Sequence, residues 1–113
     1  MTKTTELLEG VYITELEKGS VIDIETKSRH YSVEYLGGDQ VRVSGHPQWC
    51  PTPVVARLQG SLGDSGVFEP GFVGPGMHMV FQRFDDRLPV TTTEVKDLRL
   101  AGRVSRRVPG SEN

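Results

Sequence analysis

Residues 21–44 read VIDIETKSRHYSVEYLGGDQVRVS, and this stretch decides the fold. Apolar and polar side chains alternate through residues 21–26, through 30–36 and again through 41–44, which is the two-residue period of half-buried strands. Gly37-Gly38-Asp39 separates the second run from the third, and glycine pairs of this kind favour a tight hairpin turn. The stretch therefore predicts a three-stranded antiparallel meander.

Further runs rich in β-branched and aromatic residues lie on both sides of the meander. Residues 11–14 precede it, while residues 54–58, 77–84 and 90–100 follow it. Turns rich in glycine and proline separate the runs, and no strand–helix–strand pattern occurs. The sequence therefore predicts an all-β fold, either a small antiparallel barrel or a compact sandwich of six to seven short strands. The predicted core consists of Ile22, Ile24, Tyr31, Val33, Val41, Val43, Met77, Met79 and Phe81.

The two ends of the chain and the glycine-rich segment differ from these runs. Residues 2–9 predict a short helical turn, because Thr4 or Thr5 can cap it and Gly10 ends it. Residues 60–66 predict a loop. Beyond it, the predicted buried anchors are Phe68, Phe72 and Val73. We expect residues 1–100 to form a single β domain with an N-terminal arm, and residues 101–113 to form a polar, disordered tail.

Length and composition exclude several classes of protein. The chain has 113 residues and a formal net charge of −2, so no overall attraction to nucleic acid or membrane is expected. No apolar run approaches the roughly 20 residues that span a bilayer. A single cysteine rules out an intrachain disulfide and favours a reducing compartment, so we expect a cytoplasmic protein.

The segment Gly-His-Pro-Gln-Trp-Cys-Pro-Thr-Pro at residues 45–53 gathers the rarest residues of the chain. It contains the only tryptophan, the only cysteine and three of the seven prolines. An exposed Trp49 in a loop stiffened by prolines is suited to anchor a partner. The alternative is that Trp49 folds back and covers an open end of the barrel. We therefore predict a non-catalytic binding or protein-interaction module. It would dock, or form a homo-oligomer, through this loop or an unpaired edge strand. The candidate binding residues are His46, Trp49, Cys50 and His78.

A metal or thiol site is the first alternative. His46 and Cys50 are four residues apart, and His30 and His78 could complete a set of zinc ligands. Paired motifs such as Cys-x-x-Cys are missing, so no metal or other cofactor is predicted. Cys50 with a histidine could also act as a nucleophile. Its place between Trp49 and Pro51 indicates burial instead, so the prediction leans against an enzyme.

Binding of single-stranded nucleic acid is the second alternative. Tyr31, Tyr35 and Trp49 could stack on bases, and arginines at the C-terminal end add positive charge. These arginines are Arg99, Arg103, Arg106 and Arg107. Tyr31 and Tyr35 share an apolar face with Val33, which favours the core for both. Nucleic acid is therefore the less favoured partner.

Several short motifs resemble those of a group of small uncharacterised bacterial all-β proteins. They are residues 24–31, Trp49-Cys50-Pro51, Gly60-Ser61, residues 71–79 with their Gly-Met-His, and Thr92-Thr93-Glu94-Val95. The resemblance covers roughly residues 20–100 and draws attention to Cys50 and His78. It implies a self-contained bacterial β domain, and it implies no activity, because none is known for the group.

Overall fold

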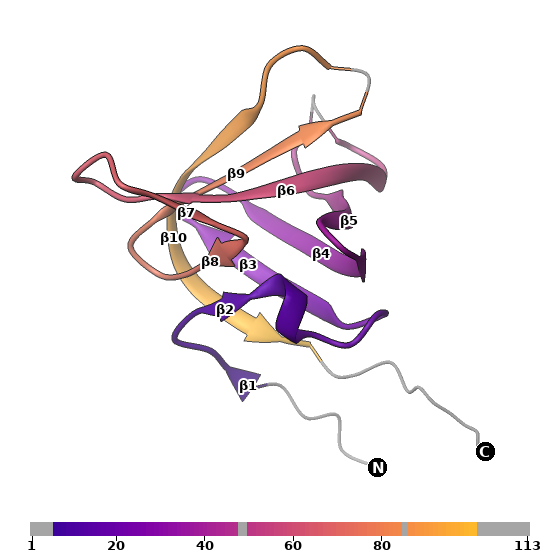
Figure 1. Cartoon of the computed structure of the whole chain (residues 1–113), viewed down its shortest axis with the longest axis horizontal. Helices are drawn as coiled ribbons and strands as arrows, with labels where there is room; N and C mark the ends of the chain where they lie inside the picture. Colours follow the sequence, from indigo (N-terminus) through magenta and orange to yellow (C-terminus); the bar gives the residue numbers. More distant parts are fainter. Residues whose placement is uncertain (1–5, 48–49, 85, 102–113) are drawn as a thin grey trace.

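A computed structural model describes residues 6–47, 50–84 and 86–101 of the chain. Within these residues, a ring of hydrogen-bonded strands forms a small antiparallel barrel (Figure 1). Its strands are β3 (Val21–Thr26), β4 (His30–Gly37), β5 (Gln40–Ser44), β6 (Val54–Leu62), β9 (His78–Arg83) and β10 (Val90–Leu100). Each pairs with the next, and β10 pairs with both β9 and β3, which closes the ring.

Shorter elements lie outside the ring. β1 (Glu6–Leu7) pairs with the end of β10, and β7 (Phe68–Pro70) pairs with the end of β6. β2 (Val11–Tyr12) and β8 (Phe72–Val73) form a separate two-stranded sheet. A 3-10 helix, η1 (Ile13–Glu15), follows β2 and buries Ile13.

The structure confirms the all-β fold and the predicted meander, and its closed ring decides for the barrel over the sandwich. The helical turn predicted at residues 2–9 is misplaced, because residues 6–7 are strand β1 and the helical turn is η1. Residues 60–62, predicted as loop, extend β6 instead. The predicted tail beyond residue 101 lies outside the described residues.

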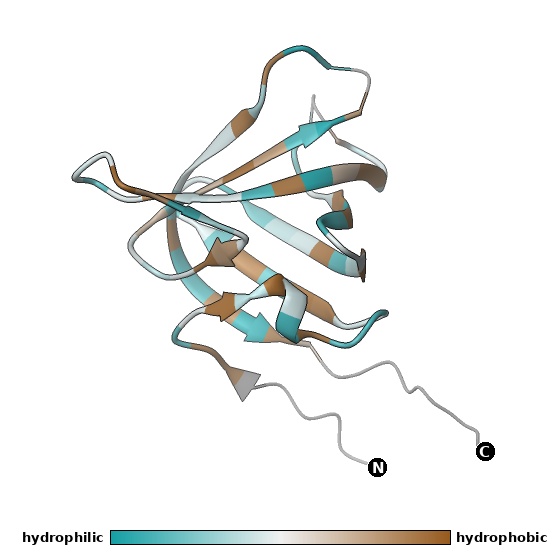
Figure 2. Ribbon diagram, viewed as in Figure 1, coloured by the Kyte–Doolittle hydropathy of each residue, from teal (hydrophilic) through white to brown (hydrophobic). Residues whose placement is uncertain are grey.

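The barrel interior contains the predicted core, with one exception. Alternation along the strands sends apolar side chains inward, and Figure 2 shows the alternating hydropathy. The rings of Tyr31 and Phe81 meet edge to face inside, with centroids 5.8 Å apart. Met77 is only partly buried because it precedes β9. Of the anchors predicted beyond the meander, Val73 is buried and Phe72 half-buried, whereas Phe68 is 42% exposed on β7.

Bulges bend the strands enough for so small a sheet to close. On β6, the register against β9 shifts between Leu58 and Gly60. Gly60 has a positive φ of 147°, and a Cβ there would collide with the carbonyl oxygen of Glu69 on the neighbouring β7. Only glycine therefore allows β7 to lie this close to β6. On β10, the register against β9 shifts between Thr91 and Glu94.

Because neighbouring strands run in opposite directions, three connections meet at one end of the barrel. They are the β3–β4 turn at residues 27–29, the β5–β6 connection at 45–53 and the β9–β10 loop at 84–89. In Figure 1, the β5–β6 and β9–β10 connections lie at the end of the molecule away from β1 and β2. The four candidate binding residues are thus divided: by sequence His46, Trp49 and Cys50 belong to one of these connections, whereas His78 begins β9.

Candidate ligand-binding cleft

A cleft of about 230 Å³ opens at this end of the barrel, beside the first residues of β10. We call it the β10 cleft. Its described lining consists of Ser28, Arg29, Tyr31, His46 and residues 90–93. The cleft exists because β10 pairs with β3 only from Val95 onward, so residues 90–93 extend beyond the last paired residue of β3, Thr26. On that side they face the β3–β4 turn and the start of the β5–β6 connection.

The β3–β4 turn holds Arg29 at the mouth of the cleft. The backbone N–H of Thr26 donates to the carbonyl oxygen of Arg29 at 2.7 Å. The Thr26 hydroxyl lies 2.9 Å from both the carbonyl oxygen and the amide nitrogen of Arg29. A threonine at the end of β3 therefore closes the turn, as short polar side chains do next to tight turns. The backbone of Arg29 is thereby fixed, while its side chain is exposed.

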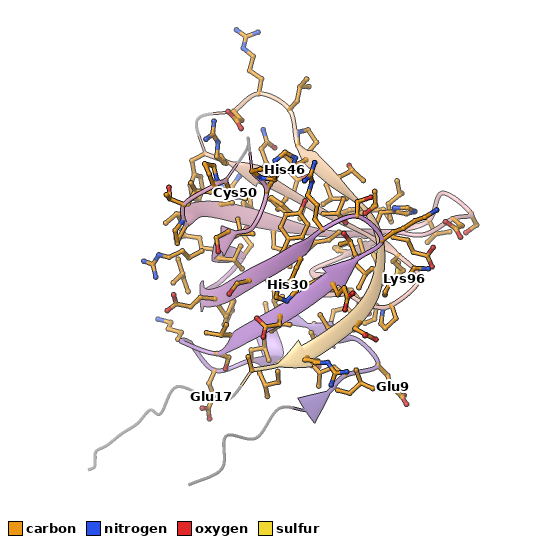
Figure 3. All side chains as sticks on the ribbon, turned by 180° about the vertical axis from the view of Figure 1, so that it is seen from behind. Glu9, Glu17, His30, His46, Cys50 and Lys96 are labelled. Atoms are coloured by element: carbon orange, nitrogen blue, oxygen red, sulfur yellow. The ribbon has the colours of Figure 1, made fainter. Side chains whose placement is uncertain are left out.

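The β5–β6 connection supplies His46 and, behind it, Cys50. The N–H of Cys50 donates to the carbonyl oxygen of His46 at 3.0 Å, and the N–H of Gly45 donates to that of Cys50 at 3.1 Å. These bonds fold the segment back on itself, so His46 and Cys50 lie near each other at one end of the molecule (Figure 3). His46 is half-buried in the cleft wall, and Cys50 is fully buried.

The bulge on β10 arranges the opposite wall. Thr92 and Thr93 together face Met79, since Thr91 pairs with Val80 and Glu94 pairs with His78. The amide of Met79 donates to the Thr92 hydroxyl at 3.0 Å, which replaces the strand-to-strand bond that the bulge removes. The Thr92 hydroxyl in turn donates to the carbonyl oxygen of Thr93 at 2.7 Å. The amide of Ser28 donates to the Thr93 hydroxyl at 3.2 Å and links the turn to β10.

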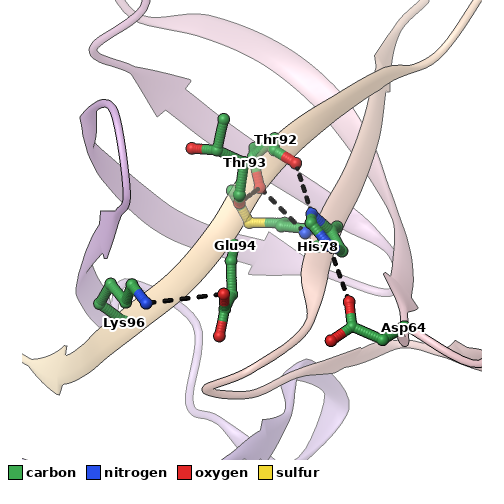
Figure 4. A network of polar contacts seen from close by, with 7 residues as sticks. Asp64, His78, Thr92, Thr93, Glu94 and Lys96 are labelled. Carbon is green, nitrogen blue, oxygen red and sulfur yellow. Dashed lines mark hydrogen bonds and ion pairs between the residues drawn. The ribbon is translucent and has the colours of Figure 1, made fainter.

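His78 lies on the other side of the same bulge (Figure 4). Its Nδ1 is 3.0 Å from the carbonyl oxygen of Thr92, and its Nε2 is 3.4 Å from an Asp64 carboxylate oxygen. A carbonyl oxygen only accepts, so Nδ1 carries a proton and donates it. His78 therefore braces β9 against β10 and adds an ion pair with Asp64 when the ring is protonated.

Burial dominates the electrostatics of two ionisable groups at the cleft, Cys50 and Tyr31. It raises the pKa of the Cys50 thiol, although the backbone at His46 and the charge of Arg83 act in the opposite direction. Burial also raises the pKa of the Tyr31 phenol, and the nearby Cys50 adds to the effect, whereas Arg29 lowers it. Both groups therefore stay protonated at neutral pH.

The predicted candidate residues do not form a metal centre. In the part of the chain that the structure describes, no three His, Cys, Asp or Glu side chains are grouped so as to hold a metal ion. His30 is exposed on β4, and the ring nitrogens of His78 face Thr92 and Asp64. Trp49 lies outside the described residues, so its role as a contact anchor stays a prediction.

The nucleic-acid alternative loses two of its stacking residues. Tyr31 and Tyr35 are 2% and 6% exposed, so their ring faces belong to the core, which the apolar alternation favours. The Tyr35 hydroxyl donates to the carbonyl oxygen of Gly38. Arg99 is exposed on β10, whereas Arg103, Arg106 and Arg107 lie outside the described residues.

Most of the cleft lining was not predicted from the sequence. Of the four candidate binding residues, His46 alone is among the described lining residues, and of the candidate stacking residues, Tyr31 alone. The sequence places Ser28 and Arg29 between the predicted strands at 21–26 and 30–36, and residues 91–93 within the run at 90–100, and neither position indicates binding. One usable signal is the run of three threonines, because consecutive hydroxyl side chains break the inward–outward alternation that a paired strand requires.

No protein-family model, curated protein or solved structure compared with this chain matches it. The resemblance to the bacterial group therefore stays a prediction. Among the described residues, no helix has the length and apolar character needed to cross a membrane.

Proposed function

We propose that this protein is a non-catalytic binding module that takes a small molecule into the β10 cleft. The observation that carries the proposal is the cleft itself: about 230 Å³, with charged, aromatic and hydroxyl side chains converging from three parts of the chain. Concave sites with a few converging polar groups on a rigid scaffold are typical of small-molecule binding. The volume is below the roughly 300–1,000 Å³ of sites for drug-sized ligands, which favours a small one.

Two features favour binding over catalysis. A nucleophilic cysteine needs a thiolate, whereas Cys50 is fully buried and burial raises its pKa. A general base needs an uncommitted nitrogen that can reach its substrate. The Nδ1 of His78 donates to Thr92, and its Nε2 faces Asp64. The single, buried Cys50 also supports a reducing compartment such as the cytoplasm.

Docking of a protein partner is the other function that the sequence predicts. In the ring each of the six strands has a neighbour on both sides, so among the described strands the free edges are β1 and β7 of the large sheet and β2 and β8 of the two-stranded sheet. These four strands have two or three residues each, which offers little backbone for strand addition. This observation supports the cleft over an edge strand as the binding surface.

Amide chemical shifts of the whole chain test the proposed site. The protein is titrated with a set of small fragments that includes anions, cations and neutral molecules. At least one fragment should cause saturable shifts centred on residues 28–31, 46 and 90–93. Thr91 is exposed and lines the cleft, so Thr91→Trp should abolish these shifts by filling it. Lys96→Trp, further along β10, is the control and should keep them. If no fragment shifts the cleft amides, or if Thr91→Trp binds normally, the proposed site is wrong.

A further inference from the structure

The described lining of the β10 cleft offers positive charge and hydrogen-bond donors without a carboxylate. Arg29 contributes a guanidinium group, and Ser28, Thr91 and Thr93 contribute hydroxyls. A cationic ligand would find no counter-charge on these residues, and its desolvation would go uncompensated. The lining therefore matches an anionic ligand in sign.

Arg29 is available to such a ligand. In the described part of the chain its guanidinium makes no ion pair, in contrast to Arg42, which pairs with Glu34, and Arg57, which pairs with Asp39. Its charge acts on the interior of the cleft, because it lowers the pKa of the Tyr31 phenol against the larger effect of burial. A guanidinium that lines the cleft and pairs with no carboxylate of the described residues can turn its paired donors to an oxyanion.

The hydroxyls differ in what they can still donate. Thr92 accepts from Met79 and donates to the carbonyl oxygen of Thr93, so its proton is committed. Thr93 accepts from the amide of Ser28, which leaves its own proton for another acceptor. Thr93 is one of the two residues that the bulge places opposite Met79, and its hydroxyl accepts from the amide of Ser28 in the turn that carries Arg29. Arg29 and Thr93 thus line one opening, and the hydrogen bond from Ser28 to Thr93 joins the segments that carry them.

We propose that the ligand of the β10 cleft is a small oxyanion, a carboxylate or a phosphate monoester, bound by Arg29 and the Thr93 hydroxyl. The proposal rests on the proposed function and specifies the chemistry of that site. The volume of about 230 Å³ leaves room for one ring or a short chain behind the anionic group. Val90, which is half-buried, provides apolar surface for that part of the ligand.

Matched probes of one shape and different charge test the proposal. Benzoate, benzamide and benzamidinium are titrated into the whole protein, and amide shifts at residues 28–31, 46 and 90–93 are followed. Comparing phenyl phosphate with benzoate distinguishes a phosphate site from a carboxylate site. Comparing phenyl phosphate with inorganic phosphate shows whether binding needs a ring. Benzoate or phenyl phosphate should saturate these shifts, benzamide should bind about tenfold more weakly or worse, and benzamidinium should not bind.

Variants of Arg29 test whether its positive charge binds the anion. Arg29→Gln should weaken binding of the preferred anion by roughly tenfold or more, because a charge-assisted bond is replaced by a neutral one. Arg29→Lys keeps the charge without the paired donors and should recover part of the affinity. Arg99→Gln removes an exposed arginine at the far end of β10 and should leave binding unchanged. Unaltered spectra away from the turn report that each variant is folded.

The outcomes separate this inference from the proposed function. If benzamide or benzamidinium shifts the cleft amides as strongly as benzoate, the cleft binds small molecules but the inference on charge is overturned. The same holds if Arg29→Gln binds the anion as tightly as the unaltered protein. If none of these probes, nor any fragment of other chemistry, shifts the cleft amides, both proposals are overturned.

Discussion

Gly45 sets the path of the chain into the cleft wall. Its φ is 127°, and a Cβ there would collide with the carbonyl oxygen of His30. Gly45→Ala should lower the free energy of unfolding by about 2 kcal/mol or more, from the strained φ together with the collision. Gly38→Ala is the matched control, with a φ of 59° and no atom within 4 Å of the new Cβ, and should cost only about 1 kcal/mol. Urea unfolding measures both. Equal losses would show that His30 does not constrain Gly45.

The thiol of Cys50 should be unreactive in the folded protein. The side chain is 0% exposed, and burial raises its pKa, so the thiolate is scarce at neutral pH. At pH 7.5, iodoacetamide should modify the folded chain at least about a hundredfold more slowly than the urea-unfolded chain, because reaction requires local opening. Mass spectrometry of timed samples gives both rates. A folded-state rate close to that of the unfolded chain would restore the thiol-site alternative.

Single residues could be predicted from the sequence only where their neighbours determine them. Cys50 is one such residue. Its place between Trp49 and Pro51 predicts burial, and the structure confirms it. The importance of Arg29 could not be seen in this way. Its neighbours Lys27 and Ser28 are those of any surface turn, and its role depends on residues 90–93, which are about sixty positions away.

The strands differ in how well their sequences predict them. β3 and β4 alternate without interruption, and their predicted bounds differ from the observed ones by at most the final residue. β6 was predicted to end at Leu58, whereas it continues to Leu62. The reason is Gly60, which looks like the start of a loop but occupies a bulge where β7 comes too close for any side chain. Local sequence does not distinguish a glycine that lets two strands lie close together from a glycine in a turn.

The bulge on β10 depends on the hydroxyl of Thr92. That hydroxyl accepts the amide of Met79, and both residues are buried. Thr92→Val keeps the shape but leaves a buried N–H without a partner, so it should cost about 1–3 kcal/mol of unfolding free energy. Thr92→Ser retains the hydroxyl and should cost less. Urea unfolding compares the three proteins, and hydrogen exchange at the Met79 amide should accelerate only in the valine variant. A valine variant as stable as the serine one would contradict this role.

At the scale of the molecule, the closure of the ring is the feature that local sequence does not predict. The alternation of β3 to β5 is equally compatible with a sandwich, because both architectures bury one face of each strand. What selects the barrel is the pairing of β10 with β9 on one side and β3 on the other, with register shifts on β10 in each pairing. The pairing of β10 with β3 joins residues about seventy positions apart, and no short motif encodes it. The cleft results from the same closure, because it lies where β10 extends beyond its pairing with β3.

The closed core also places two acids, Cys50 and Tyr31, out of contact with water, and this sets a limit at alkaline pH. Burial raises the pKa of both groups above their usual values of 9.0 and 10.0. In the range above those values the folded chain holds more protons than the unfolded chain. The free energy of unfolding therefore falls as pH rises, by at most about 1.4 kcal/mol per pH unit for each group. Below pH 9 this contribution to stability is fully present.

Melting temperatures between pH 7 and pH 11 measure this loss. The melting temperature should decline above pH 9, and the decline should be shallower in the double variant Cys50→Ala, Tyr31→Phe, which has neither acid. Each single variant should lie between the two. Both substitutions cost some packing or polar contact, so the slope against pH, rather than the melting temperature at any one pH, is the quantity to compare. If the double variant and the unaltered protein lose stability in parallel, then ionisation outside the barrel core accounts for the alkaline loss, and the two buried acids are not its cause.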